Sequence, residues 1–99
     1  DNMHMLSLVV DESRKELEDL ESALKDDNRE VMRKTIHRMI PVWEMLGKEY
    51  LLRDFQERLH DMDSSDEFIC EHAIQIIEWV KKLIEETEKE LRKYENSDC

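Results

Sequence analysis

Inner residues recur at steps of three and four along almost the whole chain. The spacing is most regular in the last third, at Ile69, Ala73, Ile76, Val80, Leu83, Thr87, Leu91 and Tyr94. Because an α-helix completes a turn in about 3.6 residues, this step places them on one stripe of a helix. The chain also has one glycine and one proline, too few for a β-protein with many turns. We therefore predict an all-α protein.

Polar turns divide the pattern into four predicted helices, over residues 4–25, 28–46, 48–62 and 65–95. The inner stripe of the first helix is Leu6, Val10, Leu17, Leu20 and Leu24, with the polar Ser13 occupying one step of the stripe. That of the second is Met32, Ile36, Met39, Trp43 and Leu46, and that of the third is Leu52, Phe55, Leu59 and Met62. Short connections force neighbouring helices to run antiparallel. Residues 1–99 are therefore expected to form a single domain, an antiparallel up-and-down four-helix bundle.

Local residue patterns mark the helix ends. Asp27 with Glu30, and Ser64 with Glu67, have the spacing of capping boxes at the start of the second and fourth helices. Gly47 stands where a helix commonly closes in a left-handed conformation. Glu16, Glu18, Asp19 and Glu21 form an acidic run, which is predicted to be a solvated helix face rather than a catalytic carboxylate pair.

The chain is strongly acidic, with a formal net charge of −11. This charge would repel a nucleic-acid backbone or an anionic membrane, so we expect neither as a partner. No run approaches the roughly 18 apolar residues that span a bilayer. We expect a cytoplasmic, monomeric domain in which Cys70 and Cys99 are reduced thiols, a disulfide between them being the alternative.

His37 stands out on the second predicted helix because it points away from the core. At about 100° per residue, it lies roughly 140° from the centre of the inner stripe. Arg33, Lys34 and Arg38 surround it with positive charge, which suits a phosphoryl group of about −2 charge. The alternative interpretation of these three cations is ordinary surface charge.

Pro41 follows His37 by one helical turn. Because proline has no N–H, it cannot donate to the carbonyl of His37, and we expect the helix to bend or open there. Apolar residues beyond the histidine exceed what the inner stripe can absorb, so Ile40, Pro41 and Met45 are predicted to form an exposed apolar margin. With Glu44 they are candidates for docking a partner, unless another segment covers them.

From about Leu6 to Leu59 the chain resembles the histidine-containing phosphotransfer (HPt) domains of two-component signalling. The residues that carry the resemblance are, in chain order, Leu17-Glu18-Asp19-Leu20-Glu21-Ser22-Ala23-Leu24, Asp26-Asp27-Asn28, Ile36-His37-Arg38-Met39 and Leu46-Gly47. The family usually has a lysine three residues after the histidine and a small residue next. This chain has Ile40 and Pro41 there, as in a variant found in some hybrid sensor kinases. Arg33, Lys34 and Arg38 are the candidates to replace the lysine.

The resemblance implies a phosphorelay. His37 would accept a phosphoryl group from the aspartyl phosphate of one response-regulator receiver domain and pass it to another. Imidazole suits this role because a ring nitrogen is a nucleophile near neutral pH and a good leaving group when protonated. The receiver is expected to supply Mg²⁺, and the domain to bind no cofactor. With one glycine the chain has no phosphate-binding loop, so we expect no kinase activity of its own.

Two other kinds of function remain open. The alternatives to a phosphorelay are a non-catalytic helical scaffold or adaptor that binds a partner, and a degenerate phosphotransfer domain that docks on receivers without accepting phosphate. A metal site is not expected, because there is no HExxH or CxxC pattern among His4, His60, His72 and the cysteines. Cys70 and His72 are two residues apart and so point to different faces of a helix.

Overall fold

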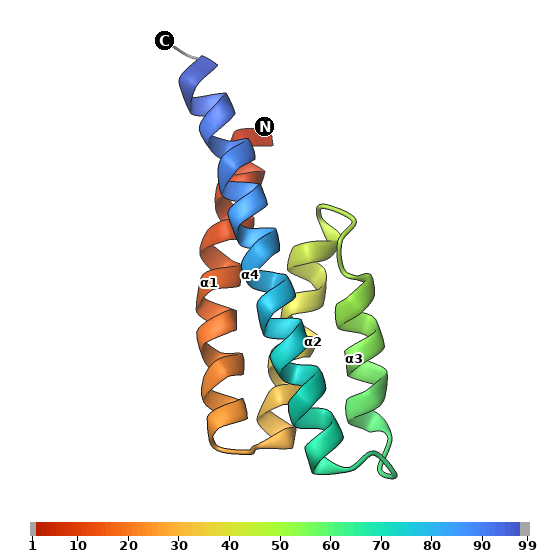
Figure 1. The fold of residues 1–99 in the computed structure, drawn as a ribbon. Helices are drawn as coiled ribbons and strands as arrows, with labels where there is room; N and C mark the ends of the chain where they lie inside the picture. Colours follow the sequence, from red (N-terminus) through yellow and green to blue (C-terminus); the bar gives the residue numbers. More distant parts are fainter. Residues whose placement is uncertain (1, 98–99) are drawn as a thin grey trace.

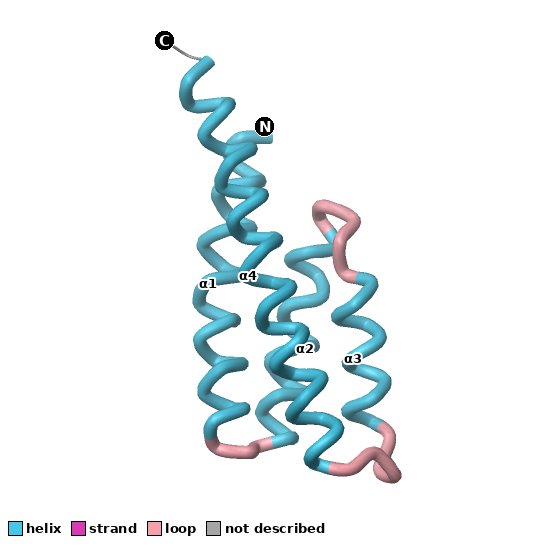
Figure 2. Tube along the Cα trace, in the orientation of Figure 1, coloured by secondary structure: helices cyan, strands magenta, loops and turns pink. Residues whose placement is uncertain are grey.

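The fold is all-helical in the computed structural model, which describes residues 2–97 (Figure 2). Its four packed helices are α1 (Asn2–Lys25), α2 (Arg29–Glu44), α3 (Tyr50–His60) and α4 (Asp66–Ser97). The predicted all-α class is confirmed. The second and third helices are shorter than predicted, because α2 ends at Glu44 and α3 begins only at Tyr50.

Each helix packs against the next one in the chain, and α1 also packs against α4. The two ends of the chain lie at the same end of the molecule, whereas the α1–α2 and α3–α4 connections lie at the other (Figure 1). There α1 and α4 extend beyond the two shorter helices, which gives an elongated molecule of 54 × 22 × 17 Å. None of the helices over residues 2–97 combines the length and apolar content needed to cross a membrane.

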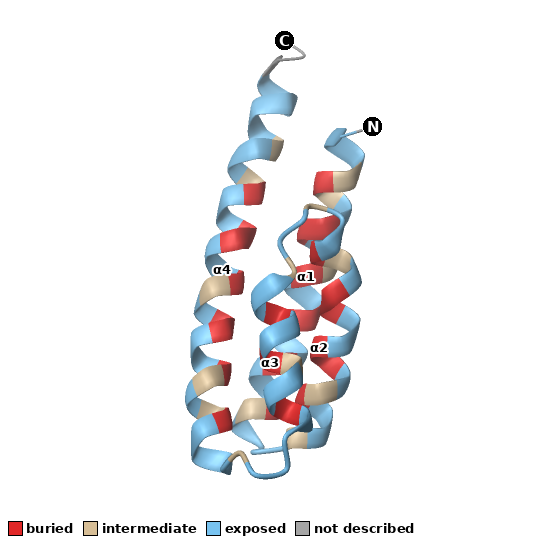
Figure 3. Cartoon of the chain, turned by 90° about the vertical axis from the view of Figure 1, so that its right-hand side faces the viewer, coloured by how far each residue is buried: buried red, intermediate tan, exposed pale blue. Residues whose placement is uncertain are grey.

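The core forms where the inner stripes of the four helices meet (Figure 3). Most of the predicted inner positions are buried, including all of those listed from Ile69 to Thr87. Two buried threonines satisfy their hydroxyls locally: Thr35 donates to the carbonyl of Val31 and Thr87 to that of Leu83. Their hydroxyls therefore cost the core little.

Some predicted core positions are wrong. Met62 is 88 % exposed because the chain leaves α3 at His60 and Met62 belongs to the following turn. Leu24, Leu46 and Leu91 are only half-buried: Leu24 is in the last turn of α1, Leu46 in the turn after α2, and Leu91 toward the C-terminal end of α4. Tyr94 is exposed on the part of α4 that extends beyond α2 and α3, where Asn2 of α1 donates a hydrogen bond to its hydroxyl.

Both predicted capping boxes are wrong, because in each case the following residue caps the helix. Asn28, not Asp27, caps α2: its Oδ1 accepts from the N–H of Val31 at 3.1 Å. Asp27 instead closes α1 in a left-handed conformation with φ +52°, and the amide of Asn28 donates back to the carbonyl of Ala23. A residue that closes one helix in this way cannot also cap the next.

The start of α4 shows the same displacement, since Ser65 rather than Ser64 accepts from the N–H of Phe68. The prediction for Gly47 is confirmed. Its φ is +69°, and the amide of Lys48 donates to the carbonyl of Trp43, so α2 closes with the same motif as α1.

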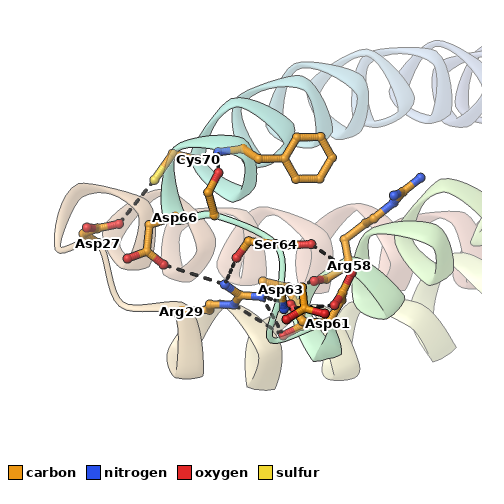
Figure 4. Close-up of polar contacts among 11 residues, drawn as sticks. Asp27, Arg29, Arg58, Asp61, Asp63, Ser64, Asp66 and Cys70 are labelled. Carbon is orange, nitrogen blue, oxygen red and sulfur yellow. Dashed lines mark hydrogen bonds and ion pairs between the residues drawn. The ribbon is translucent and has the colours of Figure 1, made fainter.

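Arg29, in the first turn of α2, ties that helix to the α3–α4 turn (Figure 4). Its guanidinium donates to the carbonyls of Arg58 at 3.2 Å, Asp61 at 2.6 Å and Ser64 at 2.9 Å, and also to that of Leu59. The last carbonyls of any helix lack a partner within the helix. Arg29 therefore supplies the C-terminal cap of α3 from a different helix, a role the sequence did not indicate.

We predict that Arg29→Ala lowers the free energy of unfolding by about 2–3 kcal/mol, because several carbonyls lose a charged donor together. Arg29→Lys should recover less than half of this loss, since an ammonium cannot reach the same spread of acceptors. Urea denaturation measures both variants. Arg92→Ala, at an exposed arginine of α4, is the matched control; an equal loss there would contradict the capping role.

Candidate functional site

His37 lies in the middle of α2 and is exposed, as its place in the sequence predicted. The buried stripe of α2 explains the direction. Ile36 and Met39 are completely buried, and at about 100° per residue His37 lies on nearly the opposite side of the helix from Met39, so it turns outward. The imidazole is therefore accessible to a second molecule.

One side chain holds the imidazole in place. The Nε2 of Gln56, on α3, lies 3.3 Å from the Nδ1 of His37, within hydrogen-bond distance. Within residues 2–97 no carboxylate forms an ion pair with His37, and its own Nε2 has no hydrogen-bond partner. The ring is thus held at one nitrogen by a neutral amide, and the other nitrogen is left for chemistry.

An open depression of about 260 Å³ surrounds the histidine between α2 and α3. Its lining residues are His37, Ile40, Pro41, Glu44, Arg53 and Gln56. Arg53 forms an ion pair with Glu44, and both side chains are more than half exposed. The depression therefore contains a cation, and it comes from α3 rather than from the helix that carries the histidine.

The three cations predicted to surround His37 lie elsewhere. Arg38 turns toward α1, where its Nη2 is 3.2 Å from Asp19. Arg33 pairs with Glu30 at 2.6 Å, which lowers the pKa of that carboxyl. Lys34 is exposed and makes no ion pair with any residue the structure describes. None of the three lines the depression.

The predicted docking margin is partly wrong. Ile40 is only 6 % exposed, because α3 packs on this side of α2 and covers it. Pro41 and Glu44 are exposed, and Met45 is 45 % exposed, as predicted. The backbone does not open at the histidine, since α2 continues as a helix across Pro41 to Glu44.

His72 and Cys70 have structural surroundings. His72 is half-buried, with its ring centroid 4.8 Å from that of Phe55, and burial lowers its pKa. The thiol of Cys70 donates to Asp27 at 3.2 Å, and burial raises its pKa. Cys99 lies outside the described residues. No group of three or more His, Cys, Asp and Glu side chains in the described part of the chain could hold a metal ion.

Glu16 was predicted to lie on a solvated face and is instead buried on α1, with 8 % exposed. One of its carboxyl oxygens, Oε1, has no hydrogen-bond partner among the described residues. Burial raises the pKa of Glu16 to about 7, and the negative charge of Glu12 adds to this; Arg38 opposes the shift and Asp19 reinforces it. The departure arises because α2 packs against this side of α1, which the sequence of one helix does not reveal.

The raised pKa of Glu16 makes stability depend on pH. Between the unfolded value of 4.5 and the folded value of about 7, the folded state binds more protons, so stability falls as pH rises through this range. We predict that Glu16→Gln raises the free energy of unfolding at about pH 8 by on the order of 1–3 kcal/mol. Urea denaturation at about pH 5 and pH 8 checks this.

The control is Glu18→Gln, at an exposed carboxylate of the same helix. It should change stability little at either pH. An effect of Glu16→Gln that is the same at both values would show that this carboxyl does not titrate between them.

No protein-family model, curated protein or solved structure matches this chain. The chemistry of the site is therefore inferred from its own geometry. An exposed imidazole is held at Nδ1 by an amide and faces an open depression that contains a guanidinium. Such a group can act as a nucleophile toward an electrophile brought by another molecule.

Proposed function

We propose that this protein is a phosphotransfer module of a phosphorelay, and that its helices form an antiparallel up-and-down bundle that presents His37 to receiver domains. His37 accepts a phosphoryl group from the aspartyl phosphate of one receiver and passes it to the aspartate of another. The observation that carries the proposal is the exposed imidazole, with Gln56 at one nitrogen and the other nitrogen without a partner.

Gln56 assigns different roles to the two ring nitrogens. A side-chain amide can turn either its oxygen or its NH₂ toward a neighbour, and rotation by 180° exchanges the two. With its oxygen toward Nδ1, Gln56 accepts a hydrogen bond from the Nδ1–H, which keeps the proton on Nδ1 and leaves a lone pair on the Nε2 of His37. This is the nitrogen that attacks phosphorus.

Each transfer exchanges one bond to phosphorus for another. In the forward step the P–Nε2 bond forms while the P–O bond to the receiver aspartate breaks, and the carboxylate leaves. In the second step the acceptor carboxylate attacks and the imidazole leaves. Such transfers depend chiefly on positioning and on neutralising charge. The receiver brings Mg²⁺, and the domain binds no cofactor of its own.

The receiver docks on the exposed stripe of α2 that begins at His37. Pro41 and Met45 follow the histidine at four and eight residues, so the three lie along one side of the helix, with Glu44 beside them. Met45 is 45 % exposed, and Pro41 is exposed as well. Apolar surface next to a reactive group fits the centre of a transient interface.

We predict that His37→Gln abolishes phosphorylation. In one experiment the purified protein is incubated with receiver domains that have been labelled with acetyl [³²P]phosphate. In a second it is incubated with ³²P-labelled phosphoramidate, which phosphorylates imidazoles without a receiver. Label on His37 should be lost in acid and kept in base. His60→Gln, at another exposed histidine, should be labelled as fully as the unaltered chain.

Label that survives His37→Gln would refute the proposed site. A domain that binds receivers and takes up no label from either donor would instead be a degenerate phosphotransfer domain. One that binds no receiver at all would fit the scaffold alternative.

We predict that Met45→Glu slows transfer from a receiver by about tenfold, because a charge enters the apolar part of the docking stripe. Helical circular dichroism and the urea midpoint should not change. Ile40→Glu behaves differently, since burying a carboxylate in the core lowers the free energy of unfolding by about 3 kcal/mol or more. A rate unaffected by Met45→Glu would place the interface elsewhere.

A further inference from the structure

The depression beside His37 contains one guanidinium, that of Arg53. Arg53 precedes Gln56 by three residues on α3, and residues at this spacing lie next to each other on a helix surface. Gln56 in turn contacts the imidazole. Arg53 is therefore fixed to the same helix face as the group that orients His37.

The other cations near His37 in the sequence are less well placed. Arg33 makes two hydrogen bonds to the carboxylate of Glu30, at 3.2 and 2.6 Å. Arg38 is engaged with Asp19 on the α1 side of α2. Lys34 is exposed outside the depression.

Glu44 holds Arg53 in the unphosphorylated protein. Both side chains are more than half exposed, and an exposed ion pair of this kind contributes little to stability. Arg53 can therefore exchange Glu44 for another anion at a small cost in free energy. A phosphoryl group on His37 carries about −2 charge and three acceptor oxygens, more than the single charge of a carboxylate, and so competes well for the guanidinium.

We propose that Arg53 is the positioning residue for the phosphoryl group, and that it leaves Glu44 to bind the phosphoryl oxygens once His37 is phosphorylated. This inference rests on the proposed role of His37 as the phosphoacceptor. Arg53 approaches the phosphoryl group from α3, because the position one turn after His37 on α2 is the buried Ile40 and offers no cation. Glu44 acts as the competing ligand and limits how readily Arg53 is released.

The two residues should therefore have opposite effects. Removing Arg53 takes a cation from the phosphoryl group, whereas removing the charge of Glu44 frees that cation. The effect of Glu44 should also require Arg53, because Glu44 acts only by holding it. A merely structural ion pair would show neither the opposite signs nor this dependence.

The test uses phosphoramidate, so that receiver docking plays no part. The Nε2 of His37 attacks phosphorus, the P–Nε2 bond forms as the P–N bond of phosphoramidate breaks, and the protonated nitrogen of phosphoramidate leaves as ammonia. ³¹P NMR follows formation of phosphohistidine and, after the donor is removed, its hydrolysis to orthophosphate. The chain is used in full, and urea denaturation confirms that each variant is folded.

We expect Arg53→Ala to slow phosphorylation about tenfold and to shift the phosphohistidine ³¹P resonance, since one charge-assisted contact is lost. Arg53→Lys should recover part of the rate. Glu44→Gln should accelerate phosphorylation, and in the Arg53→Ala background it should change nothing. Arg58→Ala, on the same helix but with its guanidinium 5.7 Å over the Phe68 ring, should behave as the unaltered protein.

The outcomes separate the two proposals. If the unaltered protein takes up no phosphoryl group on His37, the proposed function fails. If it does, and Arg53→Ala matches it in rate and ³¹P shift, the role of Arg53 is overturned while that of His37 stands. Acceleration by Glu44→Gln that persists without Arg53 also overturns the exchange.

Discussion

Burial of one stripe of α2 between its neighbours sets the rotation of that helix, and the site depends on this rotation. Ile36, Met39 and Trp43 are completely buried, so α2 cannot turn about its axis without exposing large apolar side chains. His37 is held outward as a consequence. The same packing against α3 buries Ile40 and removes it from the surface that a partner could touch.

The position of α3 is the second requirement, because α3 brings Gln56 and Arg53 to the histidine. This helix has 11 residues, and one buried stripe of three side chains holds it against the bundle. Arg29 adds a fixed point at its C-terminal end by binding carbonyls of α3 and of the turn that follows (Figure 4). The hydrogen bonds of Arg29, at the end of the bundle where α3 connects to α4 (Figure 1), thus help to hold Gln56 and Arg53 beside His37.

Errors in the sequence-based predictions arose where two helices compete for the same residue or surface. Asp27 has the side chain of a cap and the spacing to Glu30, but closing α1 requires it in a left-handed conformation. Glu16 lies in an acidic run, but α2 packs against it and leaves its carboxyl buried. In both cases the local pattern suits one helix taken alone, and the neighbouring element decides the conformation or the burial.

Four helices, most of their inner stripes and the outward direction of His37 follow from the amino-acid pattern, because periodicity is a property of a single helix and fixes which residues share a face. Which side chains meet that histidine depends instead on how the helices pack. Gln56 and Arg53 reach His37 because the turn through Gly47 sets how α3 lies along α2. The pattern of a single helix does not specify that register. The cations predicted from the chain neighbours of His37 therefore lie elsewhere: Arg33 and Arg38 pair with other carboxylates, and Lys34 lies outside the depression.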